Sequence, residues 1–148
     1  MITRVLLSMV SCFLGGGALA QTDWTFVDGR GQVVAYVVLN HDMNIYMWSG
    51  EAVAYMLPNG SDGFQLYRFN GKHMGWYTQG LLIDHRGDTV CVRKEALDWR
   101  APIIEPVKSK RLLAPTRGVQ EQAPVRPPDT RRWSATRCRQ FLGEGVSE

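Results

Sequence analysis

The stretch that decides the fold is Leu66-Tyr67-Arg68-Phe69-Asn70-Gly71-Lys72-His73-Met74-Gly75-Trp76, which reads as two short strands joined by a turn. Asn70-Gly71 is the strongest sequence signal for a two-residue type I′ turn, because both central residues of that turn take positive φ. The aromatic residues on either side are typical of strands. The stretch therefore predicts a β-hairpin.

Three other stretches repeat this pattern, at residues 26–36, 45–55 and 82–92. Arg30, Ser49 and Arg86 stand in place of asparagine before the glycine, which gives weaker versions of the same turn. Internal repetition outweighs any single motif and predicts four hairpins. The turn glycines, which are 19, 21 and 16 residues apart, are Gly31, Gly50, Gly71 and Gly87.

The position of the turn predicts which side chains share a face, because residues equally far from a two-residue turn lie opposite each other. One face is bulky and should be largely buried. It carries Val27, Val34, Tyr36, Tyr46, Trp48, Val53, Tyr55, Tyr67, Phe69, Met74, Trp76, Ile83, Val90 and Val92. The other face has a small residue at the same place in each unit, which predicts four backbones converging near a pseudo-four-fold axis. These axis-packing residues are Ala35, Ala54, Gly75 and Cys91.

Residues 1–20 have the three parts of a cleavable secretory signal: a positive charge at Arg4, an apolar run, and the small-residue exit Ala18-Leu19-Ala20. The apolar run is shorter than the ~20 residues of a membrane span. Cleavage would begin the mature chain near Gln21 and lower the formal net charge from +3 to +2. This charge is ordinary and gives no reason to expect a nucleic-acid partner. We therefore expect export to the periplasm or the extracellular space.

Composition divides the mature chain near residue 100. Residues 21–100 contain one of the seven prolines and four of the five tryptophans, as expected for a folded domain. Residues 101–132 are rich in proline and arginine, which predicts an extended or disordered linker. Residues 133–148 place Trp133, Phe141 and Leu142 near helical spacing and predict a short amphipathic helix or hook.

The basic, aromatic C-terminal segment is the expected contact for a partner. Its chemistry suits the cell wall, an anionic membrane surface or another envelope protein. A frayed, solvated tail is the open alternative. Trp48 and Trp76 could add a stacking platform for a ligand, although core packing is the default for aromatic residues on alternating strands. The contact candidates are Trp48, Trp76, Trp133, Phe141 and Leu142.

Two cysteines, Cys91 and Cys138, remain in the mature chain. In an oxidising compartment they could form a disulfide that ties the tail to the core. The sequence alone does not show that their Cβ atoms meet. Two separate thiols, with Cys91 buried as a small hydrophobe, are therefore the open alternative.

Motifs for catalysis, for metal ligation or for a cofactor are not found in the sequence. His85 and Asp88 flank the fourth turn, and a cross-strand hydrogen bond between them is favoured over a catalytic dyad. Asp84, His85 and Asp88 nevertheless define the alternative to a binding protein, a small hydrolase-like or metal-assisted enzyme. The sequence thus predicts no catalytic, metal or cofactor residue, and an enzyme remains the second hypothesis.

The chain resembles the four-fold β-flower family of bacterial proteins. The resemblance rests on Ile45 to Tyr55 and on Phe69 to Trp76, covers about residues 24–96, and extends toward the aromatic C-terminal segment. It implies four hairpin units arranged as petals around an axis, and it implies no catalytic residues. The fourth unit departs from the pattern because Thr89-Val90-Cys91-Val92 lacks aromatic residues. A looser similarity to WG-type repeat proteins likewise implies a binding or structural role.

The sequence therefore predicts an all-β domain over residues 21–100, built from four β-hairpin repeats around a pseudo-four-fold axis. A Pro/Arg-rich extended tail with a short C-terminal helix or hook follows it. The expected function is that of an exported, non-enzymatic structural or binding module of the bacterial envelope.

Overall fold

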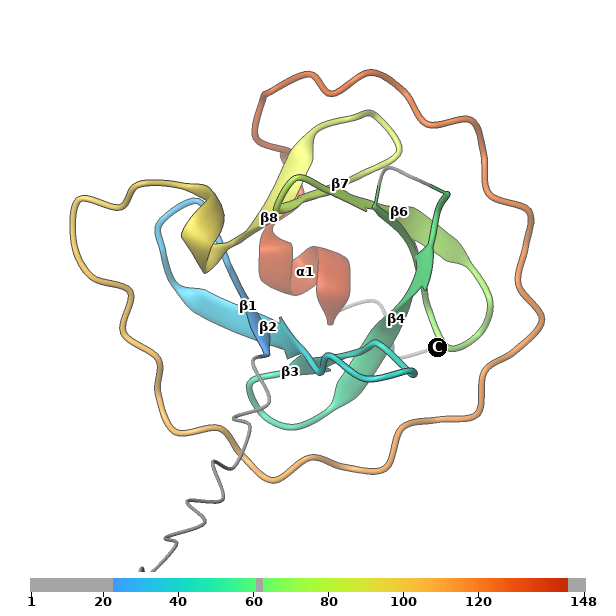
Figure 1. The fold of residues 1–148 in the computed structure, drawn as a ribbon, viewed down its shortest axis with the longest axis horizontal. Helices are drawn as coiled ribbons and strands as arrows, with labels where there is room; N and C mark the ends of the chain where they lie inside the picture. Colours follow the sequence, from blue (N-terminus) through green and yellow to red (C-terminus); the bar gives the residue numbers. More distant parts are fainter. Residues whose placement is uncertain (1–22, 61–62, 144–148) are drawn as a thin grey trace, which may run out of the picture.

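The computed structural model describes residues 23–60 and 63–143, and the expected signal segment, residues 1–20, lies outside the described residues. Its centre is a closed barrel of eight antiparallel strands (Figure 1). Each strand pairs with the next, and the first pairs with the last through Phe26 opposite Arg93 and Val27 opposite Val92. The strands are β1 (Trp24–Val27), β2 (Val33–Val37), β3 (Asn44–Met47), β4 (Ala52–Pro58), β5 (Phe64–Tyr67), β6 (His73–Thr78), β7 (Leu81–Ile83) and β8 (Thr89–Arg93).

The predicted all-β fold of four hairpins is confirmed. The four sequence repeats correspond to the pairs β1–β2, β3–β4, β5–β6 and β7–β8. A 3-10 turn, η1 (Lys94–Ala96), follows the barrel, and a short helix, α1 (Cys138–Leu142), ends the described chain.

The turn inside each repeat is longer than predicted. In the first hairpin the Gly31 N–H donates to the Asp28 carbonyl at 3.0 Å, and the Asp28 N–H donates to the Gln32 carbonyl at 3.0 Å. The same two bonds recur at the other three turn glycines, and all four glycines have positive φ. This pattern is a three-residue loop that ends in a left-handed glycine. The predicted two-residue type I′ turn is wrong, since Asn70 does not have positive φ.

Two consecutive residues with positive φ occur instead at Gln79 and Gly80, in the tight turn that joins the third and fourth hairpins. Thr78 and Leu81 pair across this turn. The two-residue type I′ signature therefore belongs to a connection between repeats, where the sequence Gln-Gly gives a weaker signal than Asn-Gly.

A β-bulge follows the turn in each hairpin. In the first hairpin Phe26 lies opposite Ala35 and Val27 lies opposite Val33, so that Val34 is the extra residue. The register shifts in the same way in the other three hairpins. A bulge bends its strand and increases the local twist, which helps a sheet close on itself. The four bulge residues are Val34, Val53, Met74 and Val90.

The bulges correct the predicted face assignment. All four bulge residues belong to the barrel core, not to the bulky outer face on which they were placed. The sequence argument assumed strict alternation, and one extra residue per strand breaks that alternation. The remaining large aromatics of the bulky set do gather outside the core, where Tyr55, Tyr67 and Phe69 form a second cluster.

The small residues predicted to surround the axis lie inside the barrel. Ala35, Ala54 and Cys91 are fully buried in the core, and each pairs with a large residue of the preceding strand. Gly75 is also buried, and a Cβ there would collide with the Ile83 carbonyl oxygen. The position therefore excludes a side chain because a neighbouring strand approaches closely.

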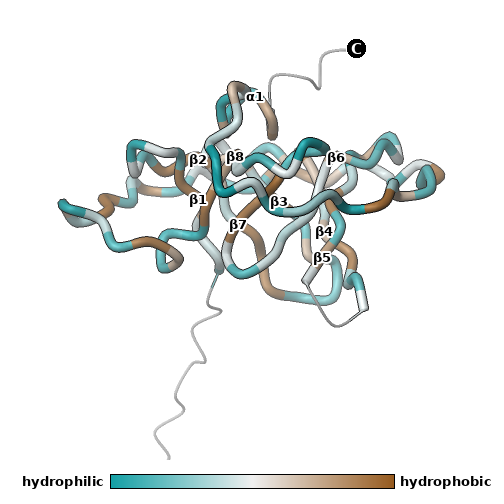
Figure 2. Tube along the Cα trace, turned by 90° about the horizontal axis from the view of Figure 1, so that it is seen from above, coloured by the Kyte–Doolittle hydropathy of each residue, from teal (hydrophilic) through white to brown (hydrophobic). Residues whose placement is uncertain are grey.

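Residues 101–132 form an extended segment that encircles the barrel, drawn in orange in Figure 1 and called the belt below. The extended conformation agrees with the sequence, but the segment is not a free linker. Backbone hydrogen bonds tie it to the second, third and fourth turns in succession. Seen from the side, the belt runs around the middle of a flattened molecule (Figure 2). Sequence composition missed this because the belt donates its bonds to the barrel and buries the barrel's aromatics rather than its own side chains.

Beneath the belt the outer aromatic side chains are covered. Tyr36, Tyr55 and Trp76 are at most 2% exposed although they point away from the barrel core. The Lys108 ammonium lies 4.3 Å from the Tyr36 ring centre, and the Arg117 guanidinium lies 3.8 Å from the Tyr55 ring centre. A cation over an aromatic face contributes about 0.5–2 kcal/mol, more when the pair is desolvated. The belt therefore serves as the outer layer of the fold.

Helix α1 occupies the middle of the barrel when the molecule is viewed down its axis (Figure 1) and projects from one end of the barrel in the side view (Figure 2). Cys138 and Leu142 are 1% exposed and belong to the same core cluster as the bulge residues. The helix therefore closes one end of the barrel. The predicted short C-terminal helix is present, and it packs against its own domain.

Candidate binding pocket at the end of the belt

A pocket of about 500 Å³ lies where the belt ends and the chain turns inward to α1. Three parts of the chain line it: the loop of the first hairpin with the start of β2, the buried residue Val90 of β8, and residues 133–140. The side chains that matter for its chemistry are Asp28, Arg30, Gln32, Trp133, Arg137 and Arg139. The pocket is therefore built from the first repeat, the last repeat and the C-terminal segment.

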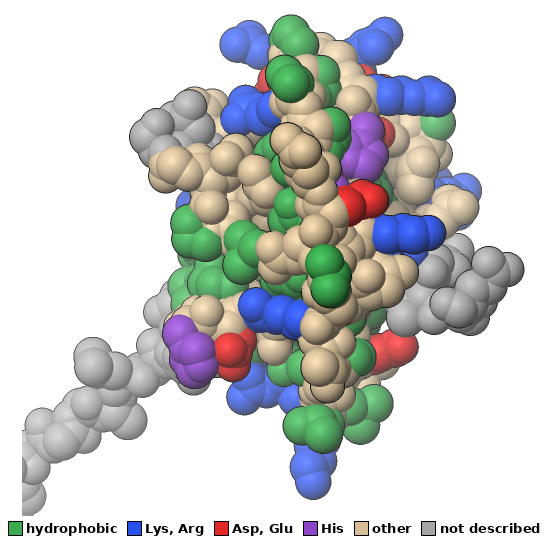
Figure 3. Space-filling model, turned by 90° about the vertical axis from the view of Figure 1, so that its right-hand side faces the viewer, with side chains coloured by type: hydrophobic (Ala, Val, Ile, Leu, Met, Phe, Trp, Pro, Cys, Tyr) green, Lys and Arg blue, Asp and Glu red, His purple; other side chains and the backbone are tan. Residues whose placement is uncertain are grey.

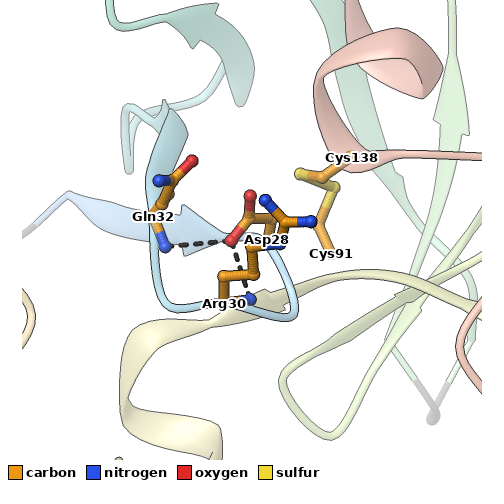
Figure 4. Close-up of a disulfide and its surroundings, with 5 residues drawn as sticks. All are labelled: Asp28, Arg30, Gln32, Cys91 and Cys138. Atoms are coloured by element: carbon orange, nitrogen blue, oxygen red, sulfur yellow. Dashed lines mark hydrogen bonds between the residues drawn. A yellow bond between two sulfur atoms is a disulfide. The ribbon is translucent and has the colours of Figure 1, made fainter. Parts of the chain in front are cut away.

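The first wall is held by a side-chain to backbone bond. One carboxylate oxygen of Asp28 accepts the backbone N–H groups of Arg30 and Gln32, both at 2.9 Å. This Asx-type arrangement is common for turn aspartates and fixes the backbone of the loop. The backbone of Arg30 is consequently held in place, and its guanidinium points toward the disulfide in Figure 4.

The second wall is held by a disulfide between Cys91 in β8 and Cys138 at the start of α1. The two Cα atoms are 5.1 Å apart, and 47 residues separate the cysteines in sequence. Arg137 and Arg139 flank Cys138, so the disulfide (Figure 4) also positions both arginines at the pocket.

The charge of the pocket is positive. Three arginines line it against one aspartate, and within the described residues none of the three guanidinium groups forms an ion pair. The one carboxylate is already engaged with backbone N–H groups. Arginine presents a planar set of donors that matches a carboxylate or phosphate. The pocket is therefore suited to an anionic group.

Trp133 supplies the apolar part of the pocket and is 47% exposed. Its indole covers Gly29, where an added Cβ would lie 3.4 Å from the ring. The backbone on both sides of it is fixed, because Thr89 donates to the Arg132 carbonyl at 2.7 Å and accepts from the Ser134 N–H at 2.8 Å. The ring is consequently a fixed, half-open surface rather than part of a frayed tail.

The other aromatic candidates lie apart from this pocket. Trp76 is 2% exposed and Leu142 is 1% exposed, so a contact of either side chain with a partner is at odds with the structure. Trp48 is half-buried and lies beside the Lys108 ammonium, at 5.2 Å from its ring centre, while Phe141 packs partly buried against the core. Strand alternation could not predict that Trp76 packs against His73 and His85, or that α1 places Leu142 in the barrel core.

Asp84, His85 and Asp88, the residues of the enzyme hypothesis, have separate structural partners. Asp84 accepts the backbone N–H groups of Arg86 and Asp88 at 2.9 and 3.1 Å and the Ser134 hydroxyl at 2.7 Å. Asp88 accepts a hydrogen bond from the Thr130 hydroxyl of the belt. The expected bond between His85 and Asp88 is therefore wrong: His85 contacts His73 instead.

This histidine pair was not predicted from the sequence, because His73 and His85 lie in different repeats. The His73 Nδ1 and His85 Nε2 atoms are 2.8 Å apart, and the other ring nitrogen of His73 is buried without a hydrogen-bond partner in the described part of the chain. Burial, and next the nearby His85, lower the pKa of His73 to about 4, while Glu121 opposes the shift. His73 is 4% exposed and is packed against the rings of Tyr67 and Trp76. It is therefore a neutral, buried histidine at neutral pH.

A second missed feature is the nine-residue period of the belt. Leu112, Glu121 and Thr130 donate their backbone N–H groups to the carbonyls of Gly50, Gly71 and Gly87 at 2.9, 2.9 and 3.0 Å. The sequence carries the same period as Pro106-Val107-Lys108, Pro115-Thr116-Arg117 and Pro124-Val125-Arg126. A search of the tail for repeats would have found this signal.

The period also explains the turn glycines. A Cβ at Gly50, Gly71 or Gly87 would collide with the belt carbonyl of Lys110, Val119 or Pro128, again nine residues apart. Each of these glycines therefore meets two requirements, a positive φ and close approach of another backbone. At Gly31 the neighbours are the side chains of Trp99 and Ile103 instead.

Residues 23–60 and 63–143 contain no cluster of three or more His, Cys, Asp or Glu side chains arranged to hold a metal ion. Among their helices none has the length and apolarity needed to cross a membrane.

Comparison with protein families identifies a match to the 4-fold beta flower protein family over residues 24–142, which includes the barrel, the belt and α1. The chain belongs to this family. Comparison with curated proteins and with solved structures finds no match for the chain.

Proposed function

We propose that this four-fold beta flower protein is an exported, non-enzymatic structural or binding module of the bacterial envelope, and that it binds its partner at the pocket beside Trp133. The observation that carries the proposal is the way this pocket is built. Its walls are fixed by the Asp28 turn and by the Cys91–Cys138 disulfide, while its charged groups are left without ion-pair partners among the described residues.

The disulfide also supports the proposed location outside the cytoplasm. Disulfides persist in oxidising environments such as the periplasm and the cell exterior and are rare in the cytosol. The signal-like residues 1–20 agree with that location, although they lie outside the described residues.

A binding role agrees better with the site residues than an enzymatic role does. The carboxylates of Asp84 and Asp88 and the imidazole of His85 are each bonded to a different neighbour, so that no general acid–base pair faces solvent there. The basic residues nearest the pocket, including Arg131 and Arg132, are exposed and can meet an anionic surface. The cell wall, an anionic membrane surface and another envelope protein are the partner classes that this chemistry fits.

The proposal is tested by expressing the full chain in a bacterium and locating its product. We expect mass spectrometry of the osmotic-shock fraction to find a chain that begins at Gln21 and carries an intact disulfide. The purified mature protein should sediment with cell wall fragments or with anionic vesicles, and Trp133→Ala should weaken that binding while Leu113→Ala, an exposed apolar side chain of the belt outside the pocket, leaves it unchanged. A chain that keeps residues 1–20 in the cytoplasm, or that sediments with neither material, contradicts the proposal.

A further inference from the structure

We infer that the pocket beside Trp133 recognises a sugar acid, that is, a pyranose ring bearing a carboxylate. The inference rests on the proposed function, since it names the ligand class of the same site. Each part of the ligand corresponds to one wall of the pocket: the carboxylate to the arginines, the flat face of the ring to the indole, and the hydroxyl and amide groups to the polar side chains between them.

The carboxylate is recognised by Arg30, Arg137 and Arg139. These come from two walls, the first hairpin loop and the start of α1, and they line one cavity with a single aspartate. None of the three guanidinium groups forms an ion pair among the described residues, and an anion between them would reduce their mutual repulsion. A guanidinium can also hold a carboxylate through two parallel N–H bonds, which adds geometric selectivity.

The arginines are prepared for binding by their backbone. Arg30 lies in the loop that Asp28 fixes, and Arg137 and Arg139 flank a half-cystine. Only the side chains have to be ordered on binding, which reduces the entropic cost of association. The long side chains reach the ligand from a scaffold that does not move with them.

The ring of the sugar lies against Trp133. Its indole is half exposed, its back is packed on Gly29, and the two hydrogen bonds to Thr89 hold its backbone. Gln32, Thr136 and Gln140 line the same pocket and add polar donors and acceptors. A fixed apolar surface with polar groups at its edges suits a molecule that has one apolar face and a polar rim, whereas an inorganic anion would leave the indole uncovered. The cavity of about 500 Å³ is of the size that small-molecule sites have.

The inference is tested by titrating the mature full-length protein with N-acetylmuramic acid and with N-acetylglucosamine, which lacks the lactyl carboxylate, while backbone NMR shifts are followed. We expect N-acetylmuramic acid to perturb residues 28–34 and 133–140 and to bind at least tenfold more tightly than N-acetylglucosamine. Glucuronic acid is the second probe, because it is also a pyranose with a carboxylate but belongs to the uronic acids. Tighter binding of glucuronic acid keeps the ligand class and assigns the source to uronic acids.

Two variants show which groups carry the recognition. Arg30→Gln with Arg137→Gln should abolish the preference for the carboxylate, and Trp133→Ala should weaken both sugars at least fivefold. Arg86→Gln, an exposed arginine of the fourth turn, is the matched control and should change neither affinity. The thermal midpoint of each variant verifies that it folds.

Affinity for both sugar acids no higher than that for N-acetylglucosamine, or shifts confined to residues outside the pocket, would overturn the inference. Binding of inorganic phosphate as tight as that of N-acetylmuramic acid would also overturn it, because the indole would then have no role. A protein that is exported and sediments with cell walls but binds neither sugar acid would contradict this inference alone and leave the proposed function standing.

Discussion

The barrel and the belt are held in place by different means. The barrel is a closed antiparallel ladder in which backbone groups pair between neighbouring strands. The belt has no strand or helix of its own, and it depends on contacts every nine residues with the barrel turns and on cations over buried tyrosines. A proline-rich, charged segment can therefore be a structural layer when a folded surface supplies the partners that its own sequence lacks.

The belt also presents an outer surface of mixed character. Its outward apolar side chains, such as Val107, Leu113 and Val125, are at least 95% exposed. Figure 3 shows hydrophobic and basic side chains next to each other along one edge of the molecule. The side of the belt that faces the barrel makes the contacts that hold the belt in place, and its outer side contributes little to stability.

The largest expected effect comes from removing the bond that fastens the end of the belt. Replacing both Cys91 and Cys138 by serine should lower the free energy of unfolding by about 4 kcal/mol, as loop-closure entropy predicts for a loop of 47 residues. Urea denaturation of the oxidised wild type and of the double variant measures the difference. A loss below about 1 kcal/mol would show that the belt and α1 hold their positions without the disulfide.

Alanine substitutions at two glycines, Gly71 and Gly60, distinguish the stability lost through collision with the belt from the stability lost through backbone strain. Gly71→Ala should cost about 3 kcal/mol, since the new Cβ meets a belt carbonyl as well as an unfavourable positive φ. Gly60→Ala is the control, because Gly60 also has positive φ but, among the described residues, has no heavy atom within 4 Å of its added Cβ. It should cost about 1 kcal/mol. Equal losses for the two variants, measured by urea denaturation, would mean that the belt does not press on the third turn.

The histidine pair predicts an acid sensitivity. Because the pKa of His73 is lowered to about 4, the unfolded chain binds a proton between about pH 6.5 and pH 4 that the folded chain does not bind. Stability should therefore fall as the pH falls through this window, by on the order of 3 kcal/mol, and the contribution should level off below pH 4.

The control for this prediction is the exposed His41. Urea denaturation at several pH values should give a flatter profile for His73→Gln than for the wild type, whereas His41→Gln should retain the wild-type profile. An unchanged slope in His73→Gln would assign the acid sensitivity to other groups.

The smallest effect is expected at one belt cation. Arg117 lies over Tyr55 and donates to the Asn44 side chain at 2.9 Å and to the Asp42 carbonyl. Arg117→Ala should lower the free energy of unfolding by about 2 kcal/mol. Arg100→Ala, an exposed arginine before the belt, should change it by less than about 0.5 kcal/mol. A thermal midpoint of Arg117→Ala equal to that of Arg100→Ala would mean that the tyrosine is covered without help from the cation.

Features of the fold that depend on local residues could be predicted from the sequence, and features that depend on pairing register or distant contacts could not. The four hairpins were predictable because Gly31, Gly50, Gly71 and Gly87 mark local turns, and local turns need no knowledge of distant contacts. The four bulges were not predictable, since Val34 and its equivalents are ordinary strand residues. Only the shift in pairing register places their side chains on the other face of the sheet.

The pocket lay further beyond sequence reasoning. Trp133 was identified as a contact candidate, but Arg30 lies about a hundred residues away in the chain and is brought to it by closure of the barrel and by the course of the belt. The belt itself could have been inferred in part from its nine-residue period. The strands alone leave aromatic rings uncovered on the outer face of the barrel. The belt packs against its own barrel because it covers these rings.

The claim that the belt is part of the fold is tested most directly by amide hydrogen exchange of the mature protein. The backbone N–H groups of Leu112, Glu121 and Thr130 donate to the turn glycines, whereas their neighbours Leu113 and Gln122 are exposed. We predict protection at residues 112, 121 and 130, with rapid exchange at 113 and 122. Exchange of all these amides at the rate of an unstructured chain would contradict the account and return residues 101–132 to the role of a free linker.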